Sequence, residues 1–126
     1  MSPNVPSRRQ AKVALVGNPN VGKSTIFNAL TRGNAWIGNW PGTTVEKKIG
    51  KVVIEDYELE IVDLPGIYSL SAYTIDERIA IEYIIEEKPD LVVVIVNAAN
   101  IERSLYLAFS ILEANVKAII VLNMID

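Results

Sequence analysis

Cysteine and histidine are both absent from this chain of 126 residues. Disulfides and thiolate metal sites are therefore excluded, and the composition fits a reducing compartment. No apolar run approaches the roughly 18 residues of a membrane-spanning helix. No basic run stands out either, and the net charge of −3 does not indicate a nucleic-acid partner.

What remains predicts one folded domain. Half of the residues are apolar, and the length is sufficient for a hydrophobic core. Residues 1–10 hold prolines and polar residues without an apolar stretch, which predicts a flexible tail and not a signal peptide. The domain itself is predicted over residues 11–126.

The stretch from Gly17 to Ser24 reads G-x-x-x-x-G-K-S, the phosphate-binding loop pattern. A strand pattern at residues 11–16 precedes it and a helical pattern at residues 23–32 follows, which is the context that the motif requires. Its glycines let successive backbone N–H groups point at one spot beside a helix N-terminus. Lys23 can reach the outer phosphates, and the Ser24 hydroxyl can ligate Mg²⁺.

The rest of the chain alternates strand and helix patterns. Residues 34–45 fit neither period and are predicted to be a loop, as are residues 64–73. The alternation predicts an α/β fold of three layers: a mostly parallel sheet with one antiparallel edge strand and helices on both faces. Strands are predicted over residues 11–16, 46–54, 57–63, 91–97 and 116–122. Helices are predicted over residues 23–32, from Ile75 to Lys88 after a Thr74–Glu77 capping box, and from Ile101 to Asn115 after an Asn100 cap.

Helical spacing also predicts which apolar side chains share a face. Ile75, Ile79 and Tyr83 are expected on one face of the second helix. Ile101, Leu105, Ala108 and Leu112 are expected on one face of the third.

Two further motifs fall at predicted strand ends, where α/β sheets bind their ligands. In the D-x-x-G run from Asp63 to Gly66, Asp63 can hold Mg²⁺ through a water and Gly66 can offer its N–H to a terminal phosphate. In the N-x-x-D run from Asn123 to Asp126, the Asp126 carboxylate can accept hydrogen bonds from N1–H and the 2-amino group of guanine, donors that adenine lacks. By itself, D-x-x-G is often only a turn, and N-x-x-D is more often only a polar strand end. The position of both motifs at strand ends of the predicted sheet favours a binding site.

The loop at residues 34–45 carries Thr43 and Thr44. A threonine there can complete a Mg²⁺ shell and sense the terminal phosphate, in a loop that is released after hydrolysis. The alternative is a pair of solvated loop threonines. Trp36 and Trp40 are interpreted as packing residues or partner contacts and not as catalytic groups.

Together these motifs resemble the Ras-like, translation-factor-class P-loop GTPases over residues 11–126. A closer resemblance is to the cytosolic G domains of the ferrous iron transport (FeoB) family. It rests on the runs Gly17-Asn18-Pro19-Asn20, Gly38-Asn39-Trp40-Pro41-Gly42-Thr43-Thr44-Val45-Glu46-Lys47-Lys48, Asp63-Leu64-Pro65-Gly66-Ile67-Tyr68-Ser69-Leu70 and Asn123-Met124-Ile125-Asp126.

This resemblance implies roles for individual residues. Thr44 would be the Mg²⁺-linked switch threonine, and Asp63 would begin the second switch. Asn20 would help to bind K⁺ with backbone carbonyls near Gly38 and Trp40, an ion that replaces an arginine finger in that family. The implied catalytic set is Lys23, Thr44, Asn20 and Gly66, and the implied Mg²⁺ ligands are Ser24, Thr44 and Asp63. The implied nucleotide contacts are Gly17, Asn18, Pro19, Asn20, Val21, Gly22, Lys23, Ser24, Thr25, Gly42, Thr43, Thr44, Asp63, Leu64, Pro65, Gly66, Asn123, Met124 and Asp126.

The sequence departs from Ras-type enzymes at Ile67, where they place a water-orienting glutamine. Water must then be positioned by backbone groups, another side chain or a partner, as the FeoB resemblance implies. That resemblance also implies that the last strand and helix of the G domain, a helical domain and a membrane permease follow Asp126. The domain is thus expected at the cytoplasmic face of the cell membrane.

The expected function is Mg²⁺-dependent hydrolysis of GTP to GDP, linked to ferrous iron uptake and stimulated by K⁺. Without a glutamine or an arginine finger, the intrinsic rate is expected to be on the order of 10⁻⁴ to 10⁻² per second. One alternative is a GTP/GDP-sensing regulatory module with hydrolysis only as a reset. Another is a soluble GTPase of tRNA modification or ribosome assembly, which the acidic composition disfavours. An ATPase is disfavoured by Asp126.

Overall fold

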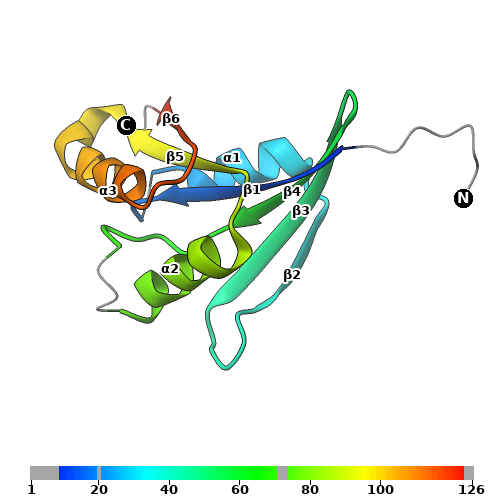
Figure 1. Cartoon of the computed structure of the whole chain (residues 1–126), viewed down its shortest axis with the longest axis horizontal. Coiled ribbons are helices and arrows are strands. Elements are labelled where there is room, and N and C mark those ends of the chain that lie inside the picture. The colour runs from blue at the N-terminus through cyan, green and yellow to red at the C-terminus, as the bar shows by residue number, and fades with distance from the viewer. Residues whose placement is uncertain (1–8, 20, 71–73, 124–126) are drawn as a thin grey trace, which may run out of the picture.

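The computed structural model describes residues 9–19, 21–70 and 74–123. Figure 1 shows a twisted sheet with α2 and α3 on one side and α1 on the other. The elements in chain order are β1 Arg9–Gly17, α1 Lys23–Thr31, β2 Ala35–Asn39, β3 Glu46–Ile54, β4 Tyr57–Asp63, α2 Ile75–Glu87, β5 Leu91–Asn97, the 3₁₀ turn η1 Ala98–Asn100, α3 Ile101–Glu113 and β6 Ala118–Asn123.

The described sheet has the strand order β2-β3-β4-β1-β5-β6. β1 pairs in parallel with β4 and β5, and β6 extends the parallel part beyond β5. β3 runs antiparallel to β4, so the three-layer α/β prediction is confirmed. β1 is central, and Leu15 is in register with Asp63 while Gly17 is in register with Ile95. The loop after β1 therefore emerges between the carboxyl ends of two neighbouring strands.

The prediction of an uninterrupted loop at residues 34–45 is wrong. Ala35–Asn39 form β2, an antiparallel partner of β3 that occupies the sheet edge, so β3 itself is internal. The segment lacks a clear polar–apolar alternation because the consecutive residues Trp36 and Ile37, whose side chains lie on opposite faces of the strand, are both apolar and exposed. Pairing with β3 overrides this weak local signal. Only residues 40–45 form the connecting turn.

Two apolar clusters fill the layers. The cluster between the sheet and α1 contains Val13, Leu15, Val21, Phe27, Ile61 and Ile95. The cluster between the sheet and the α2–α3 layer is larger and contains, among others, Val16, Trp40, Leu64, Ile67, Ile79, Tyr83, Val94, Leu107 and Ile111. β1, β4 and β5 contribute to both clusters, which explains the apolar runs at residues 13–16, 61–62 and 91–96.

The predicted apolar faces of the two later helices need correction. In α2, Ile79 and Tyr83 are buried, but Ile75 in the first turn is exposed. In α3 the buried side chains are Ser104, Leu107, Ala108 and Ile111, whereas Ile101 and Leu112 are exposed. Because α3 is apolar on more than one side, a four-residue spacing fits two faces, and packing against β5 selects one.

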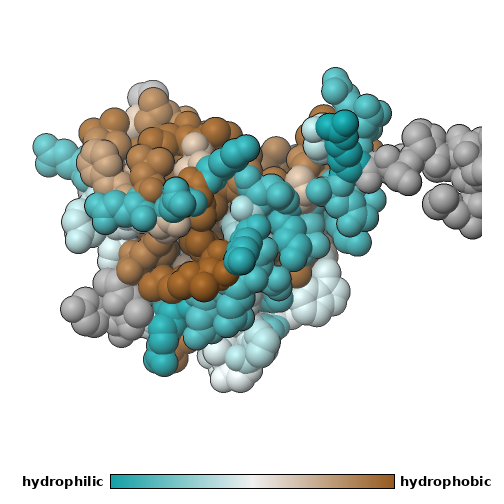
Figure 2. All heavy atoms as spheres, viewed as in Figure 1, coloured by the Kyte–Doolittle hydropathy of each residue, from teal (hydrophilic) through white to brown (hydrophobic). Residues whose placement is uncertain are grey.

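Exposed apolar side chains gather around α3 and β6, where Figure 2 shows a brown surface. They include Tyr106, Phe109, Ile120 and Leu122. Within the described ranges, no helix has the length and apolarity needed to cross a membrane.

The ends of α2 agree with the sequence. The Glu77 N–H donates to the Thr74 hydroxyl at 3.0 Å, which is the N-cap bond of a capping box. The Glu77 carboxylate reaches back to the same residue and accepts from the Thr74 hydroxyl at 3.1 Å. The helix ends at Glu87, and Lys88 adopts a left-handed conformation with φ of 47° before Pro89. Local sequence therefore determines the residues at which α2 begins and ends.

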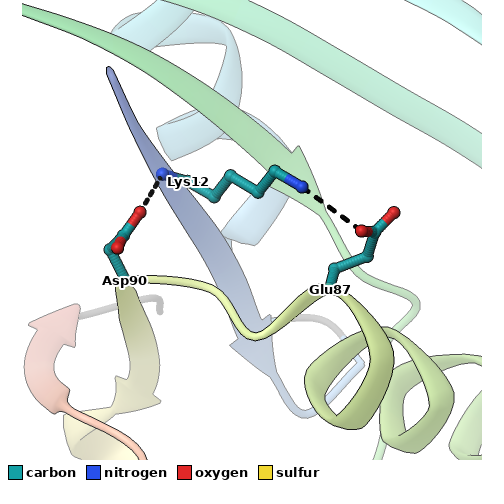
Figure 3. Close-up of polar contacts among 3 residues, drawn as sticks. All are labelled: Lys12, Glu87 and Asp90. Atoms are coloured by element: carbon teal, nitrogen blue, oxygen red, sulfur yellow. Dashed lines mark hydrogen bonds and ion pairs between the residues drawn. The ribbon is translucent and has the colours of Figure 1, made fainter. Parts of the chain in front are cut away.

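The connection from α2 to β5 is fastened to β1 (Figure 3). The Lys12 N–H donates to the Asp90 carboxylate at 2.7 Å, and the Asp90 N–H donates to the Lys12 carbonyl at 2.8 Å. The Lys12 ammonium also lies 3.2 Å from Glu87. This pair is exposed and contributes at most about 1 kcal/mol, so the backbone bonds fix the register.

Tyr83 gives the fold a testable response to alkaline pH. Burial, reinforced by Glu60, Glu87 and Asp90, raises the pKa of its hydroxyl well above the ordinary value of about 10. Above pH 10 the unfolded chain releases this proton while the folded chain keeps it, so stability is complete below pH 10 and falls as the pH rises. The expected slope is up to about 1.4 kcal/mol per pH unit.

The measurement is urea unfolding between pH 8 and 11.5, comparing the parent with Tyr83→Phe, which lacks this proton. The variant should lose less stability over that interval. Tyr106→Phe is the control, because Tyr106 is exposed on α3. Parallel curves for the parent and Tyr83→Phe would contradict the prediction.

Candidate functional site

The phosphate loop is shaped by two glycines. A Cβ on Gly17 would lie 2.8 Å from Val21 Cγ2 and 3.0 Å from the Ile95 carbonyl, so only glycine allows β1 to turn back against β5 here. Gly22 caps α1 with φ of 84°, in the left-handed region that glycine tolerates. The loop therefore delivers the chain directly into the N-terminus of α1, where free N–H groups favour an anion.

A cavity of about 420 Å³ opens over this loop. It is lined by Asn18, Pro19, Gly22, Lys23, Ser24, Gly66 and Asp76. The sequence predicted all of these residues except Asp76. An acidic residue in the first turn of a helix is ordinarily explained by the helix dipole, so the sequence around Asp76 gives no separate signal of a position at the cavity.

Lys23, which lines the cavity, forms an ion pair with Asp63, which lies behind it and is not among the lining residues. Both side chains are about nine-tenths buried, and they come from the first turn of α1 and the last residue of β4. The phosphate loop and the D-x-x-G motif, far apart in the sequence, are thus brought together as predicted. Removing one partner of such a pair typically costs about 3–5 kcal/mol, because the other charge remains buried.

The D-x-x-G segment continues from β4 alongside the phosphate loop. The Leu64 N–H donates to the Leu15 carbonyl at 3.1 Å, and the Ile67 N–H donates to the Gly17 carbonyl at 3.0 Å. A Cβ on Gly66 would lie 3.1 Å from the Pro19 backbone, so the two loops are nearly in contact there. The Ile67 side chain is 2% exposed and packs in the core, which leaves it no contact with a water in the cavity.

Asn123 reaches the phosphate loop from β6. Its side-chain amide donates to the Val21 carbonyl at 2.9 Å, and its strand position is level with Asn97 of β5. The start of the N-x-x-D motif is therefore fixed beside the loop. Asn20, Met124 and Asp126 lie outside the described residues.

The segment from Trp40 to Val45 is a turn closed by its own hydrogen bonds. The Trp40 N–H donates to the Val45 carbonyl at 2.9 Å, and the Thr43 N–H and hydroxyl donate to the Trp40 carbonyl at 3.0 and 2.9 Å. The Thr43 hydroxyl also accepts from the Val45 N–H at 3.1 Å. Thr43 therefore closes the turn, and the Trp40 carbonyl is already occupied.

This turn does not line the phosphate cavity among the described residues. Residues 39–45 instead line a separate cavity of about 620 Å³ together with Ile75. Thr44 is exposed, and Gly42 adopts φ of 72°. The structure therefore does not bring Gly42, Thr43 or Thr44 together with Ser24, nor Gly38 and Trp40 with the phosphate loop.

Oxygen ligands suited to Mg²⁺ lie at the cavity or next to it. The Ser24 hydroxyl and the Asp63 carboxylate are ligand types that Mg²⁺ prefers. Asn18 is 5% exposed, and its buried side-chain oxygen has no hydrogen-bond partner in the described part of the chain. No group of three His, Cys, Asp or Glu side chains suited to a metal occurs in the described ranges. The donor set thus fits Mg²⁺ held jointly with a phosphate and not an all-protein metal cage.

Another cavity, of about 370 Å³, lies at the opposite end of β1. Two of its lysines pair with glutamates, in the Lys12–Glu87 bond of Figure 3 and the Lys51–Glu58 contact of 3.8 Å. It offers no glycine loop or helix N-terminus to an anion. The phosphate-loop cavity is therefore the candidate nucleotide site.

The family model for "Ferrous iron transport protein B" matches residues 11–126. The chain belongs to this family. The Fe(2+) transporter FeoB of Methanocaldococcus jannaschii is 62% identical over 102 residues, which cover 81% of this chain and 15% of that protein. The chain thus spans less than one sixth of the length of that FeoB relative.

Solved FeoB structures share the fold. The G domain of the T. maritima FeoB iron transporter has a TM-score of 0.87 and 46% identity, covering 90% of this chain and 72% of that one. The cytosolic domain of T. maritima FeoB in its GMPPNP form has a TM-score of 0.84 and 48% identity, covering 87% of this chain and 44% of that one. The predicted family and G-domain fold are confirmed.

Proposed function

We propose that the chain binds GTP and hydrolyses it to GDP, as the G domain of a FeoB transporter. The observation that carries this proposal is the contact of two distant motifs with the phosphate loop, beside the cavity that opens over it. Lys23 pairs with Asp63, Ser24 lines the same space, and Asn123 is bonded to the phosphate loop. The GMPPNP form of the T. maritima relative supports the choice of nucleotide.

Each residue then has a chemical task. The loop N–H groups at the start of α1 and the Lys23 ammonium stabilise charge on the phosphates. Ser24 and Asp63 would hold Mg²⁺ with Thr44, and Asp126 would select guanine. The metal supplies charge neutralisation on the transferred phosphoryl group when it is bound. Gly66 offers a backbone N–H where a Cβ would crowd Pro19.

The proposed catalytic set contains no side chain that would orient the attacking water. Ile67 packs in the core, so the chain has no counterpart of the Ras glutamine at that position. We infer slow intrinsic turnover, on the order of 10⁻⁴ to 10⁻² per second, and stimulation by K⁺ bound through Asn20 and the carbonyls of Gly38 and Trp40. The Trp40 carbonyl becomes available only when its bonds from Thr43 open.

The potassium proposal is tested by phosphate release from Mg²⁺–GTP in KCl and in NaCl at equal ionic strength. The rate is expected to be at least about tenfold higher in KCl, because a fixed cation stabilises the transition-state charge. Asn20→Ala should remove most of this difference, and Asn34→Ala, an exposed asparagine, should not. Equal rates in both salts would rule out the ion site.

We propose that hydrolysis regulates or powers ferrous iron uptake by a membrane permease of the same polypeptide. This would place the domain at the cytoplasmic face of the membrane. The alternative is a GTP/GDP sensor that gates transport and uses hydrolysis only as a reset. Iron uptake by the full-length transporter separates them: a variant that binds but does not hydrolyse GTP supports uptake only in the sensor case.

A further inference from the structure

Trp40 anchors the Thr44-bearing turn to α2. Its side chain is 7% exposed and lies in the large core cluster, although it belongs to a connecting turn. Its ring meets Tyr83 of α2 edge-on, with centroids 6.0 Å apart and planes at 78°. The Lys47 ammonium lies 4.5 Å from the centre of the Trp40 ring. Edge-to-face and cation–π contacts of this kind are both favourable.

The anchor nevertheless leaves two buried donors unused. In the described part of the chain, neither Trp40 Nε1 nor the Tyr83 hydroxyl has a hydrogen-bond partner. An unpartnered buried polar group carries a free-energy penalty that disappears when water reaches it. The penalty therefore applies only while Trp40 is docked on Tyr83. Apolar packing thus stabilises the Trp40–Tyr83 contact, and the two unpartnered donors, Trp40 Nε1 and the Tyr83 hydroxyl, destabilise it.

Docking of Trp40 and closure of the turn go together. The Trp40 backbone is bonded to Val45 and Thr43, so its side chain and the turn are held as one unit. In this arrangement Thr44 is exposed, and it is not among the described residues that line the phosphate-loop cavity. For Thr44 to reach a metal beside Ser24, the turn must leave this position.

α2 is also connected to the second motif loop. The Ser69 hydroxyl donates to the Glu77 carboxylate at 3.0 Å, and Glu77 is buried in the first turn of α2. Leu70 packs against the same cluster as Trp40 and Tyr83. The segment after Gly66 and the turn after Trp40 are therefore both connected to α2.

We propose that the Trp40–Tyr83 contact is an autoinhibitory latch, which holds the Thr44 turn on α2 until the terminal phosphate of a guanine nucleotide releases it. The inference rests on the proposed GTP binding. A ligand shifts such an equilibrium only by its difference in affinity for the two states. GTP gains Thr44 in the released state, whereas GDP, which lacks the terminal phosphate, gains nothing. Latch strength therefore sets the ratio of GTP to GDP affinity.

Tryptophan fluorescence tests the release directly. The chain has two tryptophans, and Trp36 is 60% exposed, so Trp36→Phe leaves Trp40 as the only reporter at little structural cost. Acrylamide quenching is measured without nucleotide, with Mg²⁺–GDP and with a saturating non-hydrolysable GTP analogue plus Mg²⁺. Quenching should be low in the first two states, and a several-fold rise with a red-shifted emission is expected in the third.

A separate titration with a fluorescently labelled nucleotide distinguishes the two possible failures. If the analogue binds and Trp40 stays shielded, the latch is overturned and the proposed function stands. If neither nucleotide binds, the proposed function is overturned, and release by GTP falls with it.

Two substitutions at Tyr83 should move the affinity ratio in opposite directions. Tyr83→Phe keeps the ring and removes the unpartnered hydroxyl, so it strengthens the latch and should lower analogue affinity relative to GDP by about tenfold. Tyr83→Leu removes the edge-to-face contact and should raise that ratio by about threefold to tenfold. Tyr106→Phe, on the exposed side of α3, is the matched control.

If Tyr83 only stabilises the fold, a different result is expected. Its variants would change thermal stability and leave the ratio of analogue to GDP affinity where it was. Unchanged ratios in both Tyr83 variants, with folding verified by circular dichroism, overturn the latch. Opposite shifts, together with the change in Trp40 quenching, support it.

Discussion

Replacing Lys23 with methionine is expected to lower GTP hydrolysis by about two to three orders of magnitude and to weaken GTP binding. Among the described residues that line the cavity, Lys23 has the only cationic side chain, and Asp76 adds a negative charge. Without the ammonium, the phosphates would face carboxylates and backbone N–H groups alone. The measurement is phosphate release from Mg²⁺–GTP, with affinity from nucleotide titration.

The same substitution should also destabilise the fold. Asp63 would remain buried without its counterion, at a cost of about 3–5 kcal/mol out of a typical total of 5–15 kcal/mol. Loss of activity alone would therefore be ambiguous. Adding Asp63→Asn removes the buried charge, so the double variant should recover most of the stability and none of the activity. Urea unfolding beside the activity assay separates the two effects.

Lys51→Met is the matched control. Lys51 is exposed on β3 and lies 3.8 Å from Glu58, a surface contact worth less than about 1 kcal/mol. Its rate of hydrolysis should equal that of the parent. If Lys23→Met is stable and hydrolyses GTP within tenfold of the parent, Lys23 does not act on the phosphates.

The phosphate site was predictable from sequence because its parts are local or follow from sheet topology. Gly17 and Gly22 are required by backbone geometry within one loop, and the motif encodes that geometry. Asp63 and Asn123 were placed at the site by the rule that parallel strands carry ligands at their carboxyl ends. In the structure these two side chains contact Lys23 and the Val21 carbonyl of the phosphate loop.

The Thr44 turn was not predictable in the same way. No local pattern states that the Thr43 hydroxyl bonds the Trp40 carbonyl, or that Trp40 packs on Tyr83 of a later helix. These contacts join segments that are separate in sequence, and their formation depends on where β2 and α2 lie. β2 itself was missed because an edge strand with exposed apolar residues on both faces lacks the usual alternation.

The second large effect concerns base selection, and Asp126→Asn is expected to change the preferred nucleotide from GTP to xanthosine triphosphate. In the proposed site the Asp126 carboxylate would accept from N1–H and the 2-amino group of guanine. Xanthine carries an oxygen in place of that amino group, so it would meet a second acceptor. An asparagine can donate to this oxygen and accept from N1–H, while its NH₂ group would face the guanine amino group, donor against donor.

Two charge-assisted hydrogen bonds of about 1.5–3 kcal/mol each correspond to a preference of about 10²- to 10⁴-fold. Competition titrations of GTP, xanthosine triphosphate and ATP against a labelled nucleotide measure it. Asn123→Ala is the informative comparison, because the Asn123 amide donates to the phosphate-loop carbonyl of Val21. It should weaken the binding of GTP and of xanthosine triphosphate alike.

Glu113→Gln makes the same charge change on the exposed end of α3 and should alter neither affinity. If Asp126→Asn keeps its preference for GTP, the guanine contact belongs to another residue, and the N-x-x-D motif serves only to hold β6 against the phosphate loop.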